Sequence, residues 1–452
     1  MKNQTFLIIV SLVCALTSCT MMRPMTAVSP LSANEQMTKS ATVEKSEPFN
    51  YFADLIGNEK NLQLLLEQKE IENKDMHRSK TSAAIQALGT ARSMVGDSVG
   101  ALEAFQSIRK LYAAEPESEQ AVLTEDELNA SRNIADKYQP KAALEAILRE
   151  SAHRQIVILN EAHHVPRHRA FATLLALELR KQGFEYLAIE TLAQDTSALL
   201  KRKYPLTGDG YYSKEPMFGD LIRQSLAVGY HPVAYEQHYD PATRAVDPEA
   251  RMSAREEAQA NNIIDRVLKQ NPKAKIFIYV GYSHATKGLT DIGDNKKIAW
   301  MAERLRVKTG IDPLCIDQTE LTEPLSGSPY QTLPDAVFVG NSEESLVLVN
   351  RTKNSDYWVG EQYKGKVDMQ VIHRPVKIVN GRPDWMSMRG YRRPHTISPE
   401  LLPTKGRRLI QAFVENENAG SVPMDQIVVS ADNSLAPILM LPLGRYRFQY
   451  QE

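Results

Sequence analysis

The sequence predicts a mixed α/β protein in which a parallel βαβ sheet core follows an N-terminal helical segment and precedes a C-terminal β-rich tail. Between residues 151 and 325, short apolar runs alternate with amphipathic stretches of helical period, which is the pattern of βαβ units. Glycines also stand where three of these helices should end, and glycine is the usual residue after a helix C-terminus. They are Gly183, Gly229 and Gly310.

The expected core strands are short and rich in β-branched and aromatic residues. They are Gln155–Leu159, Tyr186–Ile189, Pro232–Tyr235, Lys275–Val280 and Pro313–Ile316. The expected helices between and after them are Arg167–Gln182, Met217–Val228, Pro248–Lys269 and Lys296–Lys308. Because a helix separates successive strands, we expect the strands to run parallel.

Residues 50–150 have helical periodicity, and Ser82–Leu111 predicts two amphipathic helices joined at Gly96 and Asp97. Four residues stand where a tetratricopeptide repeat (TPR) places its packing positions: Leu88, Gly89, Ala101 and Phe105. A stable array needs about three such repeats. The favoured interpretation of this TPR-like segment is a helical hairpin packed on the next domain, and a surface for a protein partner is the alternative.

After residue 325 the helical period fades, and Pro, Gly and Asn separate strand-like runs. These runs are Ala336–Gly340, Leu346–Asn350, Met369–Val379, Leu409–Val414, Gln426–Ser430 and Arg445–Tyr450. We expect a β-rich region over 326–452, with a small sandwich from about residue 405. The alternative is that some of these strands extend the central sheet.

The N-terminus has the features of a secretory signal. Lys2 precedes the apolar run Phe6–Leu16, which is too short to span a membrane comfortably. The following Leu-Thr-Ser-Cys resembles a bacterial lipobox, in which the cysteine thiol is acylated before cleavage. We therefore expect a signal peptide over 1–18 and a lipid on Cys19; a plain secretory signal is the alternative.

Residues 19–49 are rich in Ser, Thr, Met and Pro, which is typical of a tether between an anchor and a fold. Thr20 follows the expected lipidated cysteine, where an Asp would indicate retention in the inner membrane. The resemblance to lipoproteins therefore favours an outer-membrane lipoprotein that faces the periplasm. Of the 3 Cys, Cys315 is then the one left as a thiol, and we expect it to be buried and structural.

Composition limits the class of protein further. The 452 residues would fill about three domains. The 54 Lys and Arg against 55 Asp and Glu give a net charge of -1, which argues against a nucleic-acid partner. Three cysteines exclude a disulfide scaffold.

Ionisable or polar side chains come at the end of every expected core strand. In chain order they are Glu161, His163 and His164, then Glu190, then Glu236, then His284, then Asp317. The carboxyl ends of parallel strands meet at one edge of a sheet, where ligands bind. We therefore expect these groups to converge, and carboxylates beside imidazoles are suited to acid–base catalysis, metal binding or a polar ligand.

Structural alternatives exist for each of these residues. Glu161 and Glu190 follow buried strands, where they could pair with arginines or cap helices instead of serving a site. His164 and His168 are four residues apart, which is a metal-ligand spacing on a helix, but the complete H-E-x-x-H pattern is absent. No G-x-S-x-G elbow is present, so a serine nucleophile is not indicated.

Four runs between about 150 and 320 together resemble the Tiki, ChaN-like and erythromycin-esterase-like superfamily. They are VILNEAHHVPRH, YLAIET, REEAQANN and KIFIYVGYSHA. The matching residues are Glu161, His163, Glu190, Arg255, Glu256, Ala260, Asn262 and His284. Asn160 departs from the family, which usually has Gly there, although Asn tolerates a left-handed backbone better than most residues.

The resemblance implies an α/β domain found in ester hydrolases, membrane-tethered metalloproteases and haem-binding lipoproteins. In a hydrolase acting on a small-molecule or peptide substrate, His163 or His284 would be the general base. Glu161 and Glu190 would orient the imidazole, and Arg255 would stabilise an oxyanion or hold an anionic substrate. His164 and Glu236 are additional candidates.

Three other interpretations remain open. A divalent metal held by Glu161, His163, Glu190 and His284 would be a variant of the hydrolase, and such ligands suit Zn²⁺ or Mn²⁺. A haem or small-ligand binder without catalysis is the second, with Tyr282 or a histidine as axial ligand. The third is an interaction protein that docks through its helical segment and β-rich tail.

Overall fold

The computed structural model describes residues 48–68, 73–112, 133–134, 136–238, 247–292, 296–322, 333, 337, 344–432 and 436–452. The expected signal peptide, the acylated Cys19 and nearly all of the tether lie outside these residues. Among the helices described, none has the length and apolar character needed to cross a membrane.

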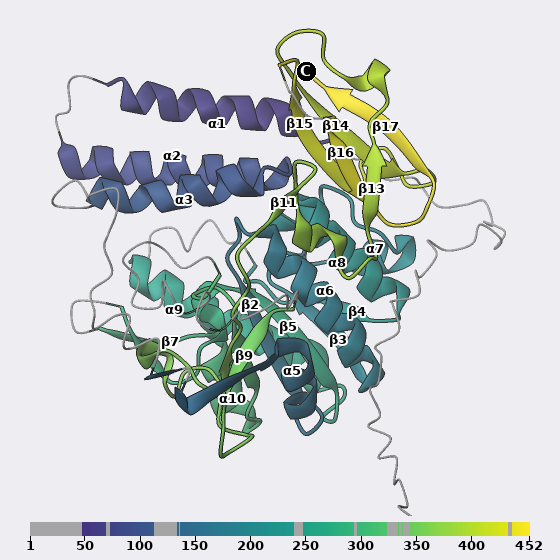
Figure 1. The fold of residues 1–452 in the computed structure, drawn as a ribbon. Helices are drawn as coiled ribbons and strands as arrows, with labels where there is room; N and C mark the ends of the chain where they lie inside the picture. Colours follow the sequence, from purple (N-terminus) through teal and green to yellow (C-terminus); the bar gives the residue numbers. More distant parts are fainter. Residues whose placement is uncertain are drawn as a thin grey trace, which may run out of the picture.

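A six-stranded parallel sheet forms the centre of the molecule, in the order β10-β8-β2-β5-β3-β4 (Figure 1). Its strands are β2 (Ile156–Glu161), β3 (Phe184–Ile189), β4 (His231–Ala234), β5 (Lys275–Gly281), β8 (Leu314–Asp317) and β10 (Met369–Gln370). The predicted α/β class and parallel sheet are therefore confirmed. β10 comes from the region after residue 325, so one strand of the tail does extend the central sheet.

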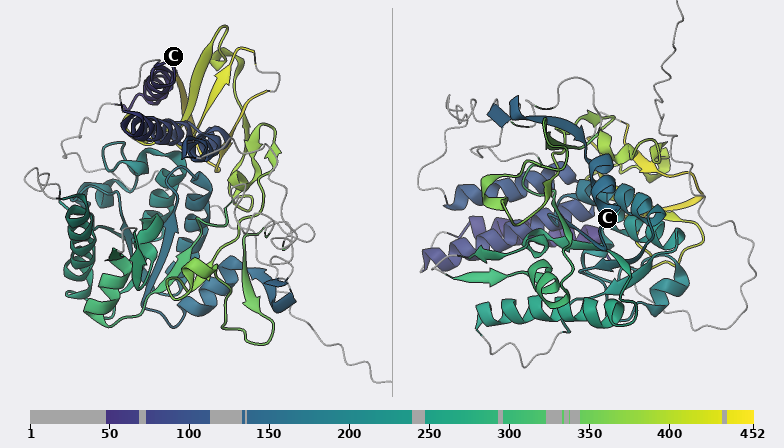
Figure 2. Two further views of the ribbon diagram at one scale, coloured as in Figure 1. Left: turned by 90° about the vertical axis from the view of Figure 1, so that its left-hand side faces the viewer. Right: turned by 90° about the horizontal axis from the view of Figure 1, so that it is seen from below.

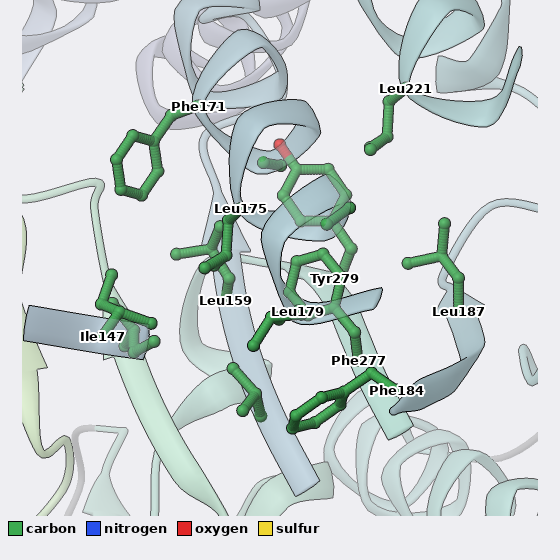
Figure 3. Close-up of a cluster of buried hydrophobic side chains, with 14 of the residues drawn as sticks. Ile147, Leu159, Phe171, Leu175, Leu179, Phe184, Leu187, Leu221, Phe277 and Tyr279 are labelled. Carbon is green, nitrogen blue, oxygen red and sulfur yellow. The ribbon is translucent and has the colours of Figure 1, made fainter. Parts of the chain in front are cut away.

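Helices cover both faces of this sheet, because successive strand residues point to opposite sides. Val157 and Leu159 pack under α5 (Ala143–Ser151), α6 (Pro166–Lys181), α7 (Ser197–Arg202) and α8 (Pro216–Ala227). Figure 3 shows this cluster. Ile156 and Ile158 pack under α9 (Pro248–Ile263), its π-helical continuation (Ile264–Leu268) and α10 (Met301–Thr309). The buried Cys315 belongs to this second layer, as expected for a structural cysteine.

The helices α1 (Tyr51–Leu66), α2 (Lys74–Met94) and α3 (Ser98–Tyr112) form a layer beside the C-terminal strands (Figures 1 and 2). The predicted hairpin is α2 and α3. Gly89 lets them approach, since a Cβ there would lie 2.6 Å from the Phe105 ring. Leu55 and Leu88 pack on Leu409 of β14, so the helices cover the C-terminal sheet.

Two expected helical stretches contain strands instead. Tyr138–Ala142, within the expected helical segment, forms β1 and pairs antiparallel with β9 (Leu346–Asn350). Pro140 lies inside it and has no N–H for a helix. The first part of the expected helix Lys296–Lys308 forms β7 (Lys297–Ala299), which pairs with β6 (Leu289–Asp291) and buries Ile298.

The C-terminal region is rich in antiparallel strands. β14 (Arg407–Val414) lies between β15 (Asp425–Ser430) and β17 (Tyr446–Gln451), close to the expected runs. The sequence missed β13 (Arg393–Thr396) and β16 (Ile438–Leu441), which pair together. Of the expected strand Met369–Val379, only β10 and Ile378–Val379 (β11) are strands, and β11 pairs with β12 (Arg382–Pro383). Most of Ala336–Gly340 lies outside the described residues.

Candidate active site

Glu161 is the last residue of β2 and is 2% exposed. The Arg169 guanidinium, from α6, donates to both carboxylate oxygens at 2.8 and 2.9 Å. Nδ1 of His163 lies 2.8 Å from Oε1 of the same carboxylate. Burial acts to raise the pKa of Glu161, but Arg169 and His163 prevail and hold it well below its usual range. The ionised carboxylate therefore favours a proton on Nδ1 of His163, which leaves a lone pair on Nε2.

Two aromatic rings and one glycine fix the position of the His163 imidazole. Tyr212 stacks on it with ring centroids 3.8 Å apart, and Tyr282 meets it edge-on at 5.1 Å. Gly281 ends β5, and a Cβ there would lie 2.5 Å from Cε1 of His163 and 3.0 Å from Oε2 of Glu190. The absence of a side chain at Gly281 thus allows the imidazole and the carboxylate of Glu190 to share one small space.

Glu190 follows β3 and is buried. Its Oε2 accepts from the backbone N–H of Gly281 at 2.5 Å, and its Oε1 accepts from Nη2 of Arg255, on α9, at 2.6 Å. Arg255 also donates to both oxygens of Glu236, at 3.0 and 2.5 Å. Burial acts to raise the pKa of Glu190, but His284, His163 and Arg255 lower it below its ordinary value. Arg255 therefore joins the carboxylates that follow two neighbouring strands.

His284 lies on the short helix Tyr282–Ala285, directly after β5. Its Nδ1 is 2.8 Å from Oε2 of Glu256, and its Nε2 is 3.1 Å from Nη1 of Arg255. Glu256 is completely buried and also accepts from the Met301 N–H. Burial acts to lower the pKa of His284, but Glu190 and Glu256 outweigh burial and raise it.

Four of the five predicted catalytic residues line one cavity of about 490 Å³: His163, Glu190, Arg255 and His284. The fifth, Glu161, lies behind His163 and contacts its Nδ1. Glu236 lines the same cavity, and the remaining lining residues are Thr191, Leu192, Tyr211, Tyr212 and Tyr282. The structure therefore brings together side chains from the ends of β2, β3, β4 and β5.

His164 does not line this cavity. Its ring stacks on Phe105 of α3 with centroids 3.5 Å apart, and its Nδ1 lies 3.3 Å from the Tyr282 hydroxyl. Burial, followed by the charges of His163 and Arg169, lowers the pKa of His164 to about 3. His164 is thus a neutral contact between the helical layer and the site.

The structure gives structural roles to His168 and Asn160, two residues beside the site. His164 and His168 do not form a metal-ligand pair, because His168 accepts from the Ala162 N–H and contacts Thr322 in the core. Asn160 needs no left-handed backbone, because it lies within β2. Its side chain instead donates to the Tyr282 carbonyl at 3.0 Å, and the left-handed residue is Tyr282 itself, with φ of 39°.

The donor set does not fit a metal ion or haem well. Within the described ranges, no three His, Cys, Asp or Glu side chains form a cluster that could hold a metal. Arg169 and Arg255 already occupy the carboxylates that a metal would need. Haem requires an apolar slot, whereas Leu192 is the one aliphatic side chain among the residues that line the cavity.

Sequence reasoning missed two residues of this arrangement and gave no role to a third. Arg169 neutralises Glu161, and nothing in the sequence separated it from the other arginines near it. Glu256 was identified in REEAQANN as a match to the superfamily pattern, but no role was assigned to it. Tyr212 reaches His163 from the short helix Tyr212–Lys214 that follows α7, and no pattern in the sequence indicates that contact.

No known protein family and no curated protein matches the chain. Two solved structures described as bacterial protein toxins are each 16% identical to this chain, with a TM-score of 0.28. The first similarity covers 55% of this chain and 51% of the toxin chain. The second covers 56% of this chain and 55% of the toxin chain. RRSP, a MARTX toxin effector domain from Vibrio vulnificus, is also 16% identical, with a TM-score of 0.27, covering 55% of this chain and 49% of its own. The chain thus spans about half the length of the structures it matches. These similarities are too distant to assign an activity.

Proposed function

We propose that the chain is a membrane-anchored hydrolase of the bacterial envelope, which cleaves ester or amide bonds at the cavity lined by His163 and His284. The observation that carries this proposal is the orientation of His163. Its Nδ1 is held by an ionised carboxylate, and its ring is fixed between two tyrosines. No side chain among the described residues forms a hydrogen bond with Nε2 of His163. That nitrogen can therefore accept a proton from a molecule in the cavity, as a general base does.

In the proposed reaction, a water molecule gives a proton to Nε2 of His163 as its oxygen attacks the substrate carbonyl carbon. Glu161 stabilises the imidazolium that forms, through the contact at Nδ1. When the tetrahedral intermediate collapses, the bond to the leaving group breaks and the imidazolium returns its proton to the leaving oxygen or nitrogen. Proton and electron pairs balance without a cofactor.

Arg255 is the proposed donor to the developing oxyanion. A guanidinium has five N–H donors. Four of them are used by His284, Glu190 and the two oxygens of Glu236, which leaves one on Nη1. Since two carboxylates already balance its charge, Arg255 is better suited to holding a neutral carbonyl oxygen than to capturing an anionic substrate.

The test measures hydrolysis of a panel of p-nitrophenyl esters and fluorogenic peptide amides by the full chain. His163→Ala and Glu190→Ala should each lower turnover by about 100-fold or more, and the exposed His153→Ala should leave it unchanged. Full turnover in both site variants would exclude this site. The same samples titrated with haemin test the binding alternative, which a Soret shift abolished by His284→Ala would favour.

Cys19 is the proposed point of attachment to the membrane. The support is the Leu-Thr-Ser-Cys sequence after an apolar run, and Thr20 favours the outer membrane. A hydrolase anchored in this way would act on substrates that reach the cell envelope. The proposed reaction does not involve a nucleic acid. A protein partner at the helical segment stays a prediction. α2 packs on β14 and Phe105 of α3 stacks on His164, so a partner would bind the outer faces of these helices.

A further inference from the structure

A second and larger cavity, of about 950 Å³, lies between α6 and residues 373–394. None of the residues that line the His163 cavity lines this one. Its volume falls in the range of about 300–1,000 Å³ that is typical of small-molecule sites. The proposed hydrolysis uses no part of it, so its side chains need a separate explanation.

One wall of this cavity is apolar. Phe171 and Leu174 on α6 lie on one side, and Trp385, Met388 and Met440 contribute further apolar surface from the C-terminal region. Phe171 belongs to the cluster drawn in Figure 3, so this wall is continuous with the core and rigidly supported. Such a wall offers a hydrocarbon group burial from water.

The rest of the lining has an excess of cations. Six cationic side chains line the cavity against three acidic ones. Each acid pairs with a lining cation, in the ion pairs Lys181–Glu178, Arg374–Asp384 and Arg389–Glu344. Arg382 and Arg392 are fully buried, and their partners Asp425 and Asp220 are not among the lining residues. The lining therefore has three more cationic than acidic side chains, and the carboxylates that pair with Arg382 and Arg392 lie behind it.

Two further observations point to a ligand here. Arg382 is 2% exposed, yet its Nε has no hydrogen-bond partner among the described residues. A buried N–H without an acceptor is costly, so an acceptor brought to Nε by a shift of the Arg382 side chain would remove a penalty. Asn380, Met388 and Arg389 line the cavity with φ of 50°, 45° and 57°. Strained non-glycine residues of this kind cluster at functional sites.

We propose that this cavity binds an amphipathic anion, with a carboxylate or phosphate headgroup on an apolar chain. The headgroup would lie among the lining guanidinium groups, which include that of Arg382, and the apolar chain would lie against Phe171 and Trp385. An adjoining cavity of about 420 Å³ shares Asn380 and Arg382 with the first and gives an extended ligand additional length. A free fatty acid and a phospholipid share this chemistry.

The test uses the full chain carrying Cys19→Ala, purified without detergent, in isothermal titration calorimetry. Dodecanoate should bind with one-to-one stoichiometry, dodecanol roughly tenfold or more weakly, and inorganic phosphate without detectable heat. A second titration, with dihexanoyl phosphatidylglycerol below its critical micelle concentration, distinguishes a phospholipid ligand from a free fatty acid. Tighter binding than dodecanoate identifies a phospholipid ligand, and weaker binding identifies a free fatty acid.

Leu174→Trp fills the cavity from its apolar wall and should weaken dodecanoate binding roughly tenfold or more, without changing ester turnover. Val307→Trp, at an exposed position on α10, is the matched control and should bind normally. Trp385→Phe should keep binding and abolish the ligand-dependent change in tryptophan fluorescence. Failure of dodecanoate to bind, equal binding of dodecanol, or unchanged binding by Leu174→Trp would each overturn the proposal.

Discussion

Nη1 of Arg255 donates a hydrogen bond to Nε2 of His284 across 3.1 Å. Because a guanidinium cannot accept, the imidazole must present a lone pair at Nε2 and carry its proton on Nδ1, toward Glu256. Protonation of Nε2 would set two N–H groups against each other and break this contact. The ionisation of His284 therefore controls how Arg255 is held.

Glu256→Gln should shift the pH dependence of turnover. The ionised Glu256 helps to raise the pKa of His284 against the effect of burial, and the amide would let that pKa fall. Since Arg255 is held by neutral His284, activity should rise with pH through the His284 pKa, and the variant should reach its plateau at lower pH. Rates of ester hydrolysis between pH 5 and 9 measure this shift. If activity falls on the acid side at the same pH in the variant as in the wild type, the prediction is wrong.

The same group links folding to pH. The pKa of His284 is raised in the folded chain, so its contribution to the free energy of unfolding is complete below its unfolded value, near 6.5, and is lost as pH rises through the folded pKa. In Glu256→Gln the pKa of His284 in the folded chain is lower. The loss of unfolding free energy with rising pH should therefore be smaller in this variant. Urea unfolding of both chains from pH 6 to 9 tests the sign.

Glu161→Gln should destabilise the fold by about 3 kcal/mol, because the buried Arg169 loses a bidentate carboxylate partner. The pKa of Glu161 is lowered, so its stabilisation is present above its ordinary value near 4.5 and is lost as pH falls. Glu178→Gln removes a more exposed ion pair and should change the free energy of unfolding by less than about 0.5 kcal/mol. Equal effects of the two substitutions at pH 7 would refute the assigned role of Arg169.

Gly281→Ala should abolish most turnover while the chain stays folded. The new Cβ would lie 2.5 Å from the His163 ring, so the imidazole must leave its place between Tyr212 and Tyr282. We expect kcat to fall by about 100-fold. Gly208→Ala is the control, since nothing lies within 4 Å of a Cβ at that position. A Gly281→Ala enzyme with normal kcat would show that the position of His163 is unimportant.

Phe105→Ala should lower kcat although Phe105 lies outside the cavity. Its ring supports His164, which contacts the Tyr282 hydroxyl, and Tyr282 contacts His163. Phe105→Leu keeps part of the apolar contact and should retain more activity than Phe105→Ala. If both variants have the same urea midpoint of unfolding and the same kcat as the wild type, α3 has no influence on the site.

Chain order and hydrophobic pattern were enough to predict the parallel sheet and the residues at its carboxyl edge. Glu190, for instance, comes directly after the apolar run that forms β3, and His284 comes three residues after the end of β5. Contacts across long sequence separations were not predictable: Tyr212 reaches His163 from the short helix Tyr212–Lys214, and Phe105 reaches His164 from another layer. β13 and β16 were missed because their pairing depends on each other rather than on a local pattern.

The packing of α1 against β14 has a consequence for the order of folding. Phe52 donates its backbone N–H to the side chain of Gln451, and Leu55 packs on Leu409. The first helix of the described chain therefore packs on α2, which follows it closely in sequence, but gains its contacts with β14 and β17 only after residues 407–451 have been synthesised. Until then the part of the apolar face that meets Leu409 is open to a chaperone.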